Sequence, residues 1–98
     1  MPKKLSDAER VQALPPLLEN GWSESDERDA ITKRFTFRNF RAAFAWMTQI
    51  ALWAEKLDHH PEWSNTYRHV DVTLTTHSAE GLTILDLELA TQMDAAAG

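Results

Sequence analysis

The chain has 98 residues, which suits one domain with a modest hydrophobic core. With 43% hydrophobic and 26% charged residues it has the composition of a globular protein, and its net charge of −5 argues against a general affinity for nucleic acid phosphates. It has no cysteine, which excludes disulfides, thiolate catalysis and zinc–thiolate sites.

Nothing in the sequence predicts a membrane partner. No stretch approaches the roughly 18 consecutive apolar residues of a membrane span. The first residues, MPKKLSDAERVQ, contain two lysines without a following apolar run, so they do not match a signal peptide. We therefore expect one cytoplasmic domain covering residues 1–98.

The first predicted element is a helix that Ser6 or Asp7 can cap. Pro15 and Pro16 are expected to break or restart it, and Gly21 is expected to end it. Its expected buried stripe consists of Val11, Leu14, Leu17 and Leu18.

A hairpin is predicted next, over residues 22–26 and 29–37. Apolar and polar residues alternate from Ile31 to Phe37, which is typical of a strand with one buried face. The polar connection SESDERD is turn-like.

From residue 38 to 57 the apolar period becomes helical. The expected buried face consists of Phe40, Ala43, Phe44, Met47, Ile50, Ala51, Ala54 and Leu57. Trp46 and Trp53 lie beside this stripe, where they fit either a wide buried face or a subunit contact.

The segment EKLDHHPEW follows and holds two of the four histidines of the chain. Pro61 disfavours a helical conformation for His60, so we expect the chain to turn there. Adjacent residues at a helix exit point in different directions, so His59 and His60 cannot both pack on the same core.

Residues 67–76 alternate again and predict a third strand, after which His77 would point with the polar residues. The last helix is expected to begin near Thr83, with Asp86 completing a capping box, and its stripe to consist of Leu85, Leu89 and Met93. This order of elements predicts an α+β fold with helices on one face of an antiparallel sheet. Three strands are few, so a fourth is expected from within the chain or from pairing between subunits.

The end of the long helix and the end of the third strand could meet around one cleft. Imidazoles titrate near neutral pH, which suits acid–base catalysis, while histidine and carboxylate together also suit zinc or iron. The spacing HEXXH is absent, and an ordinary polar helix exit remains open as a third interpretation. The candidate side chains are His59, His60 and His77, with Glu55, Asp58 and Asp86 nearby.

The same residues resemble a known family. Glu55, His59-His60-Pro61, Tyr67, His77 and Asp86, separated by three, five, nine and eight residues, resemble the signature of the pterin-4a-carbinolamine dehydratases. The segments RDAITKRFTFRNFRAAFAWM, AEKLDHHPEW, TLTTH and LDLELA extend the similarity from about residue 5 to residue 93. The resemblance implies a four-stranded antiparallel sheet with helices on one face, assembled as a homodimer or a homotetramer.

The activity implied by the resemblance is that of a carbon–oxygen lyase, 4a-hydroxytetrahydrobiopterin dehydratase. It removes water from 4a-hydroxytetrahydropterin and gives quinonoid dihydropterin, which recycles the cofactor of aromatic amino acid hydroxylases. Pterin is the substrate, and the resemblance implies neither a further cofactor nor a metal.

Carried over by position, the resemblance implies that His59, His60 and His77 are the catalytic histidines. We predict that His60 and His77 flank the reacting carbon as acid and base, with His59 assisting. Asp86 would support a histidine. Glu55 is either a supporting residue or a structural residue of the helix end.

Substrate-binding residues are predicted as well. Asp58 and Trp63 are expected at the pterin, whereas Trp22 is expected to pack in the core. His69 lies outside the motif and is expected to be an exposed strand residue, and Leu85 is less polar than expected beside Asp86.

An alternative function belongs to a different class. Animal members of the resembled family also act as a dimerisation cofactor for a homeodomain transcription factor, through the helical surface that builds the tetramer. The long helix with Trp46 and Trp53 could support such a partner, but a scaffold does not need the histidines.

Overall fold

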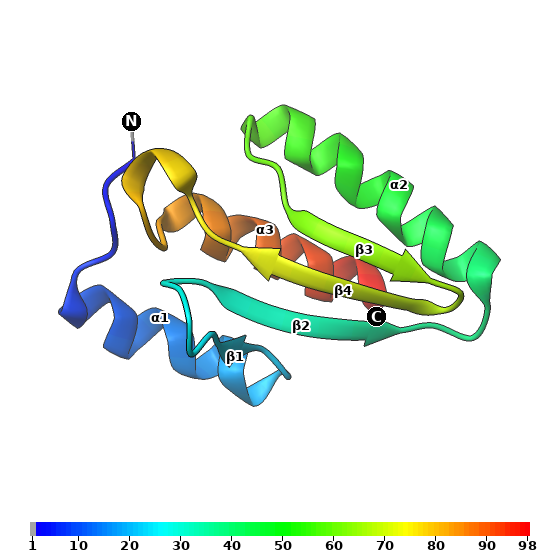
Figure 1. Ribbon diagram of the computed structural model, residues 1–98, viewed down its shortest axis with the longest axis horizontal. Helices are drawn as coiled ribbons and strands as arrows, with labels where there is room; N and C mark the ends of the chain where they lie inside the picture. Colours follow the sequence, from blue (N-terminus) through cyan, green and yellow to red (C-terminus); the bar gives the residue numbers. More distant parts are fainter. Residues whose placement is uncertain (1) are drawn as a thin grey trace.

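The structure is a computed structural model that describes residues 2–98. The strands form one antiparallel sheet in the order β1-β2-β4-β3, with three α-helices packed on one face (Figure 1). The predicted α+β class is confirmed. In chain order the elements are α1 (Asp7–Glu19), β1 (Ser23–Glu24), β2 (Ile31–Thr36), α2 (Phe40–Leu57), β3 (Glu62–Thr66), β4 (His69–Leu74), the 3-10 helix η1 (His77–Ala79) and α3 (Ile84–Ala97).

Helix α1 begins as predicted and ends at Glu19, two residues before the expected stop at Gly21. Ser6 caps it, in a capping box with Glu9. The expected break at Pro15 and Pro16 is wrong, since both prolines lie inside one continuous helix. Two hydrogen bonds are lost there, but burial of neighbouring side chains holds the turn against the core. Those side chains are Leu14 and Leu17.

The predicted stripe of α1 is too wide. Val11 is 73% exposed and Leu18 is 37% exposed, so neither is a core residue. The prediction of the hairpin is confirmed, although β1 has only two residues and pairs Ser23 with Thr32. Trp22 is buried as predicted, and its indole nitrogen donates to Asp94 at 3.0 Å.

The fourth strand comes from within the chain. The strand predicted over residues 67–76 corresponds to β4, and the segment before it forms β3, which pairs antiparallel with β4. Tyr67 has a left-handed conformation (φ 51°) in the turn between them, and the Asn65 amide donates to the Tyr67 and His69 carbonyls. Strand β3 was not predicted, because Trp63 is its only bulky apolar residue.

Helix α2 buries most of its predicted stripe, with the limits of the buried face shifted. Within the stripe, Ala43, Ile50 and Ala54 are buried, Met47 and Leu57 are half-buried, and Ala51 is exposed. Trp46 is a core residue at 4% exposure, and its indole nitrogen donates to the Met93 carbonyl at 3.1 Å. Phe40 and Phe44 are 50% and 55% exposed, so their predicted burial is wrong. A helix that is apolar around much of its circumference does not reveal from period alone which side faces the sheet.

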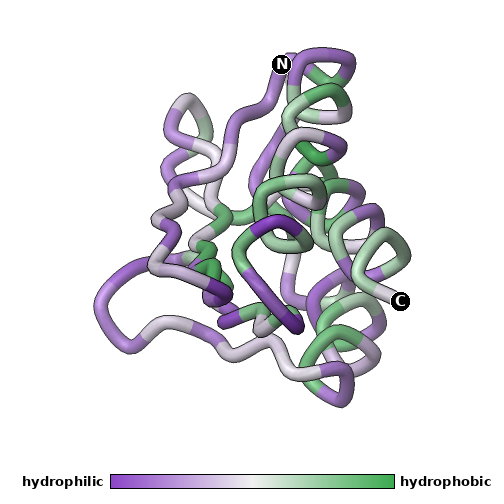
Figure 2. Tube along the Cα trace, turned by 90° about the vertical axis from the view of Figure 1, so that its right-hand side faces the viewer, coloured by the Kyte–Doolittle hydropathy of each residue, from purple (hydrophilic) through white to green (hydrophobic). Residues whose placement is uncertain are grey.

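The remaining predictions for α3 are largely confirmed. Thr83 and Asp86 form its capping box, and Leu89 and Met93 are fully buried, while Leu85 is half-buried. Helices α2 and α3 pack against each other. Along the helical coils, hydrophobic and hydrophilic stretches alternate (Figure 2). Within residues 2–98, no helix combines the length and apolar character needed to cross a membrane.

Candidate active site

The turn that follows α2 begins before the position predicted from Pro61. Asp58 adopts a left-handed conformation (φ 52°, ψ 44°) as the C-cap. Its N–H donates to the Glu55 carbonyl at 3.2 Å, and the His59 N–H donates to the Ala54 carbonyl at 3.0 Å. The left-handed residue reverses the chain, so the helix end delivers His59 and the next residue to different surroundings.

His59 is held by a buried carboxylate. Its Nε2 lies 2.6 Å from Oδ1 of Asp86, and the two residues are 7% and 0% exposed. The other oxygen, Oδ2, accepts from the Thr76 hydroxyl at 2.8 Å and from the Thr83 N–H at 2.9 Å. Asp86 therefore caps α3 and anchors the histidine with one carboxylate.

The second ring nitrogen of His59 has a different environment. The hydrogen bond of the His59 ring uses Nε2. Every fully buried side-chain nitrogen or oxygen within residues 2–98 has a hydrogen-bond partner, so Nδ1 of His59 is not fully buried and is the ring atom that remains for a ligand.

His60 and His77 are exposed, and each is paired with a glutamate. Nε2 of His60 lies 2.7 Å from Oε1 of Glu55, and Nε2 of His77 lies 2.8 Å from Oε2 of Glu62. Strand β4 ends at Leu74, so His77 begins η1 instead of ending the strand as predicted.

The three histidines line one hollow of about 740 Å³, which is large enough for a fused-ring ligand. Its walls come from the turn after α2, the segment between β4 and η1, and the start of α3. Besides the histidines it is lined by Pro2, Leu57, Asp58, Pro61, Glu62, Thr75, Thr76, Ser78 and Leu85.

Two predicted site residues lie apart from this lining. Trp63 is half-buried on β3, with its ring 6.1 Å from that of Trp46, and is not among the residues around the hollow. Glu55 is also absent from the lining, and its side chain contacts His60, which does line the hollow. His69 lies on β4, with Nδ1 3.0 Å from the Thr36 hydroxyl oxygen, outside the hollow.

The chemistry available at the hollow is proton transfer. Three imidazoles each place Nε2 against a carboxylate, which fixes the ring and leaves Nδ1 to exchange a proton. Over residues 2–98, no three histidine or carboxylate side chains are grouped so that they could hold a metal ion.

Comparison with known proteins decides the family. The family model described as pterin 4 alpha carbinolamine dehydratase matches residues 3–96. The chain belongs to this family.

Curated relatives from the same family cover the chain almost completely. A protein of Jannaschia sp. (strain CCS1) is 55% identical over 94 residues, which is 96% of both chains. A protein of Bradyrhizobium sp. (strain BTAi1 / ATCC BAA-1182) is 59% identical over 97 residues, covering 99% of this chain and 96% of the relative. Both carry the provisional name pterin-4-alpha-carbinolamine dehydratase.

Solved structures agree with this assignment. A Brucella melitensis crystal structure, described as a transcriptional coactivator/pterin dehydratase, has a TM-score of 0.91 and 52% identity, and covers 98% of this chain and 100% of its own. A pterin dehydratase-like protein, described as a RuBisCO assembly factor in the alpha-carboxysome, has a TM-score of 0.69 and 25% identity, with 80% and 90% coverage.

In this member of the dehydratase family, three side chains that were not predicted as site residues lie next to the histidines or their partners. Thr76 bonds Asp86, while Glu62 contacts both His77 and Arg28. Arg28 precedes Glu62 by 34 residues, so no local spacing links the two. Glu62 follows the HHP segment directly, and its polar character on a strand was the one available signal.

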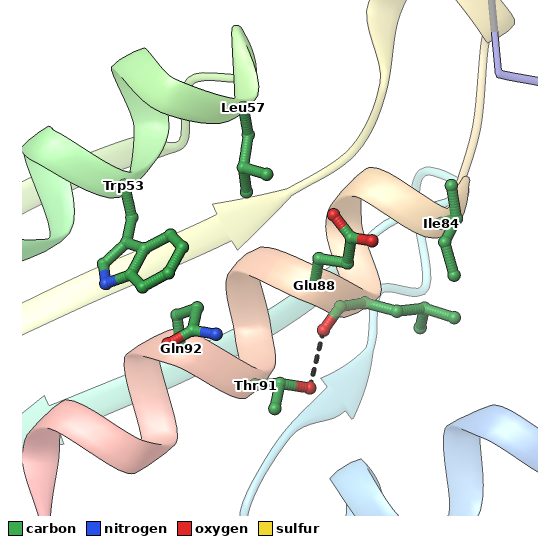
Figure 3. Close-up of a pocket in the computed structure, with 7 residues that line it drawn as sticks. Trp53, Leu57, Ile84, Glu88, Thr91 and Gln92 are labelled. Atoms are coloured by element: carbon green, nitrogen blue, oxygen red, sulfur yellow. Dashed lines mark hydrogen bonds between the residues drawn. The ribbon is translucent and has the colours of Figure 1, made fainter.

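A second hollow lies between α2 and α3 and has a different character. Figure 3 shows Trp53 and Leu57 on α2 above Glu88, Thr91 and Gln92 on α3. This groove, of about 420 Å³, contains no histidine. The groove therefore offers no imidazole, unlike the hollow lined by the three histidines.

Proposed function

We propose that the chain removes water from a 4a-hydroxytetrahydropterin at the histidine hollow and gives quinonoid dihydropterin. The observation that carries the proposal is that His59, His60 and His77 line one hollow, each with Nε2 against a carboxylate. The family match and relatives at 55% and 59% identity support a pterin substrate.

The reaction needs one acid and one base. In the carbinolamine, one ring carbon carries both a hydroxyl group and a ring nitrogen. Protonation of the hydroxyl oxygen lets the carbon–oxygen bond break, while the nitrogen lone pair forms a carbon–nitrogen double bond. Removal of the proton from that nitrogen completes the loss of one water molecule without oxidation or reduction.

We assign these two roles to the exposed histidines. His60 and His77 lie on the two chain segments that border the hollow, and both rings are open to a bound ligand. One donates to the leaving hydroxyl and the other accepts the N–H proton. His59, fixed by the buried Asp86, assists by holding the substrate or the leaving water with its Nδ1.

The cellular role follows from the product. Quinonoid dihydropterin is the form that a reductase returns to tetrahydropterin, so the reaction recycles the cofactor of aromatic amino acid hydroxylases. A cytoplasmic location fits this role. Asp58 lines the hollow and is the candidate for binding the polar edge of the pterin, with Trp63 as a more distant one.

The dehydratase assay tests the proposed function. Chemically generated 4a-hydroxytetrahydrobiopterin should lose water faster with the purified chain than without it. Because the proposed chemistry uses side-chain imidazoles, a chelator should leave the rate unchanged. A rate equal to the uncatalysed rate at neutral pH would contradict the proposal.

We also infer that the chain forms a homodimer or a homotetramer. Helix α2 exposes apolar side chains in addition to its buried face, and the rings of Phe40 and Phe44 lie 5.8 Å apart. Leu52 on the same helix is 70% exposed. A long helix that exposes such bulky residues favours burial against a second copy.

The association state has a direct measurement. Light scattering at micromolar concentration should give a mass at least twice that of the 11.2 kDa chain. Phe44→Glu should reduce that mass, whereas Gln12→Glu, at an exposed position of α1, should not. A monomeric wild-type chain would contradict the inference.

The alternative function, as a dimerisation cofactor for a transcriptional regulator, would use this same α2 surface. The Brucella melitensis protein is described as a transcriptional coactivator as well as a pterin dehydratase. The two functions separate by mutation, because a scaffold should tolerate loss of His77 and should not tolerate Phe44→Glu.

A further inference from the structure

Glu62 occupies a position between a histidine of the hollow and an arginine from another part of the chain. It begins β3 and pairs with Thr73 of β4. Its Oε2 lies 2.8 Å from Nε2 of His77. Arg28, from the loop between β1 and β2, donates from Nη1 to Oε1 and from Nη2 to Oε2, both at 2.8 Å.

We propose that Glu62, clamped by Arg28, is a positioning residue that orients the His77 ring for proton transfer. This inference rests on the dehydratase function proposed above and adds two residues to it. Glu62 and Arg28 act through His77 and need no contact with the pterin.

The environment of His77 shows why its ring needs such support. Its side chain is 75% exposed, and it begins a 3-10 helix of only three residues. Few packing contacts restrict an exposed side chain in this position, so a charge-assisted hydrogen bond is the interaction that selects one ring orientation.

The clamp also decides which ring nitrogen carries the proton. The Arg28 guanidinium and then His77 lower the pKa of the Glu62 carboxyl to about 2. Glu62 is therefore ionised at neutral pH and only accepts hydrogen bonds. Nε2 of His77 must donate to it, so the neutral ring offers Nδ1 as its base.

The two hydrogen bonds from Arg28 fix the orientation of the Glu62 carboxylate. An arginine fork matches both oxygens of a carboxylate and sets its plane. A single contact from a lysine would leave that plane free to rotate. The loop between β1 and β2 reaches Glu62 through Arg28, and the Asp29 carbonyl of the same loop accepts from the Thr75 hydroxyl at 2.8 Å.

A purely structural ion pair is the competing interpretation, and the sheet offers a matched control for it. Arg34 and Asp71 form the same kind of pair on neighbouring strands, at 2.8 and 3.1 Å. Both pairs are comparably exposed, and exposed pairs contribute little to stability. Asp71 contacts none of the histidines of the hollow, so Asp71→Ala removes an ion pair without changing the site.

The experiment compares steady-state dehydration by Glu62→Ala, Glu62→Gln and Asp71→Ala. Glu62→Ala should lower kcat by roughly 10- to 100-fold, the range expected for a misoriented catalytic group, with KM changed less than about twofold. Glu62→Gln should recover part of the loss, because its amide oxygen still accepts from Nε2. Asp71→Ala should keep the wild-type kcat.

The His77→Ala background separates positioning from a general effect. If Glu62 acts through His77, Glu62→Ala should cause no further loss once His77 is absent. Wild-type kcat for Glu62→Ala, an equal loss in Asp71→Ala, or a full additional loss in the His77→Ala background would each overturn the inference. A wild-type chain without dehydratase activity would instead overturn the proposed function itself, and with it the role given to Glu62.

Discussion

Replacing His77 by alanine should lower kcat for dehydration by roughly 10²- to 10⁴-fold, the contribution typical of a general acid or base. The side chain is exposed at the rim of the hollow, so its removal leaves no buried cavity and the fold should remain intact. The measurement is steady-state dehydration together with a thermal unfolding curve of the same sample.

The pair of His60 and His77 should behave as one unit. If they serve as acid and base of the same step, the double variant His60→Ala, His77→Ala should be little slower than the worse single variant. His69→Ala is the control, because His69 contacts Thr36 on the sheet and not the hollow. Full activity of the double variant would exclude both residues from the reaction.

Local sequence patterns predicted most elements of the fold because their signals act over a few residues. The capping box at Thr83 and Asp86 and the alternation along β2 and β4 depend only on near neighbours. Strand β3 was missed for the same reason. Its burial pattern alternates between exposed and half-buried residues, because an edge strand with one large apolar side chain gives a weak signal.

The limits of the buried face of α2 could not be predicted locally, although Ala43, Ile50 and Ala54 are buried as predicted. Phe44 and Trp46 both lie on apolar sides of the helix, and their exposed fractions of 55% and 4% are set by what the rest of the chain places opposite them. The ring centroids of Phe35 on β2 and Trp46 are 4.5 Å apart. The indole N–H of Trp46 donates to the Met93 carbonyl. Contacts with β2 and α3 therefore decide that Trp46 is buried and Phe44 is exposed. The sequence of α2 alone does not contain this information.

The candidate site likewise contains residues that local sequence predicts and residues that it does not. His59 and His60 are adjacent in sequence, and the motif spacing pointed to His77 and Asp86 as their companions. The ion pair of Arg28 with Glu62 joins the loop between β1 and β2 to the start of β3, and these segments meet because the strands assemble in the order β1-β2-β4-β3. A pairing that depends on strand order has no signature in the local sequence.

Asp86→Ala should be the most destabilising single substitution in the site. It removes the α3 capping contact and leaves the Thr76 hydroxyl and the His59 ring without their buried partner. The expected loss in the free energy of unfolding is roughly 2–4 kcal/mol, which is on the order of 10–25 °C in Tm for a chain of this size.

The first helix provides a control with the same local motif. Glu9 holds the corresponding position in the capping box of α1, but it is exposed and has no histidine partner. Glu9→Ala should lower the free energy of unfolding by at most about 1 kcal/mol. Equal melting temperatures for Glu9→Ala and Asp86→Ala would show that the buried contacts of Asp86 contribute nothing beyond capping.

Asp86→Asn separates the stabilising role of Asp86 from its effect on His59. The amide oxygen can replace Oδ2 and accept from Thr76 and from the Thr83 N–H. The amide nitrogen then faces Nε2 of His59 and is itself a donor, so Nε2 must become the acceptor and the ring proton must move to Nδ1. We therefore expect most of the stability to be kept while kcat falls, and ¹⁵N NMR of the His59 ring should show the proton on Nδ1. A proton that stays on Nε2 would mean that Asp86 does not set the tautomer.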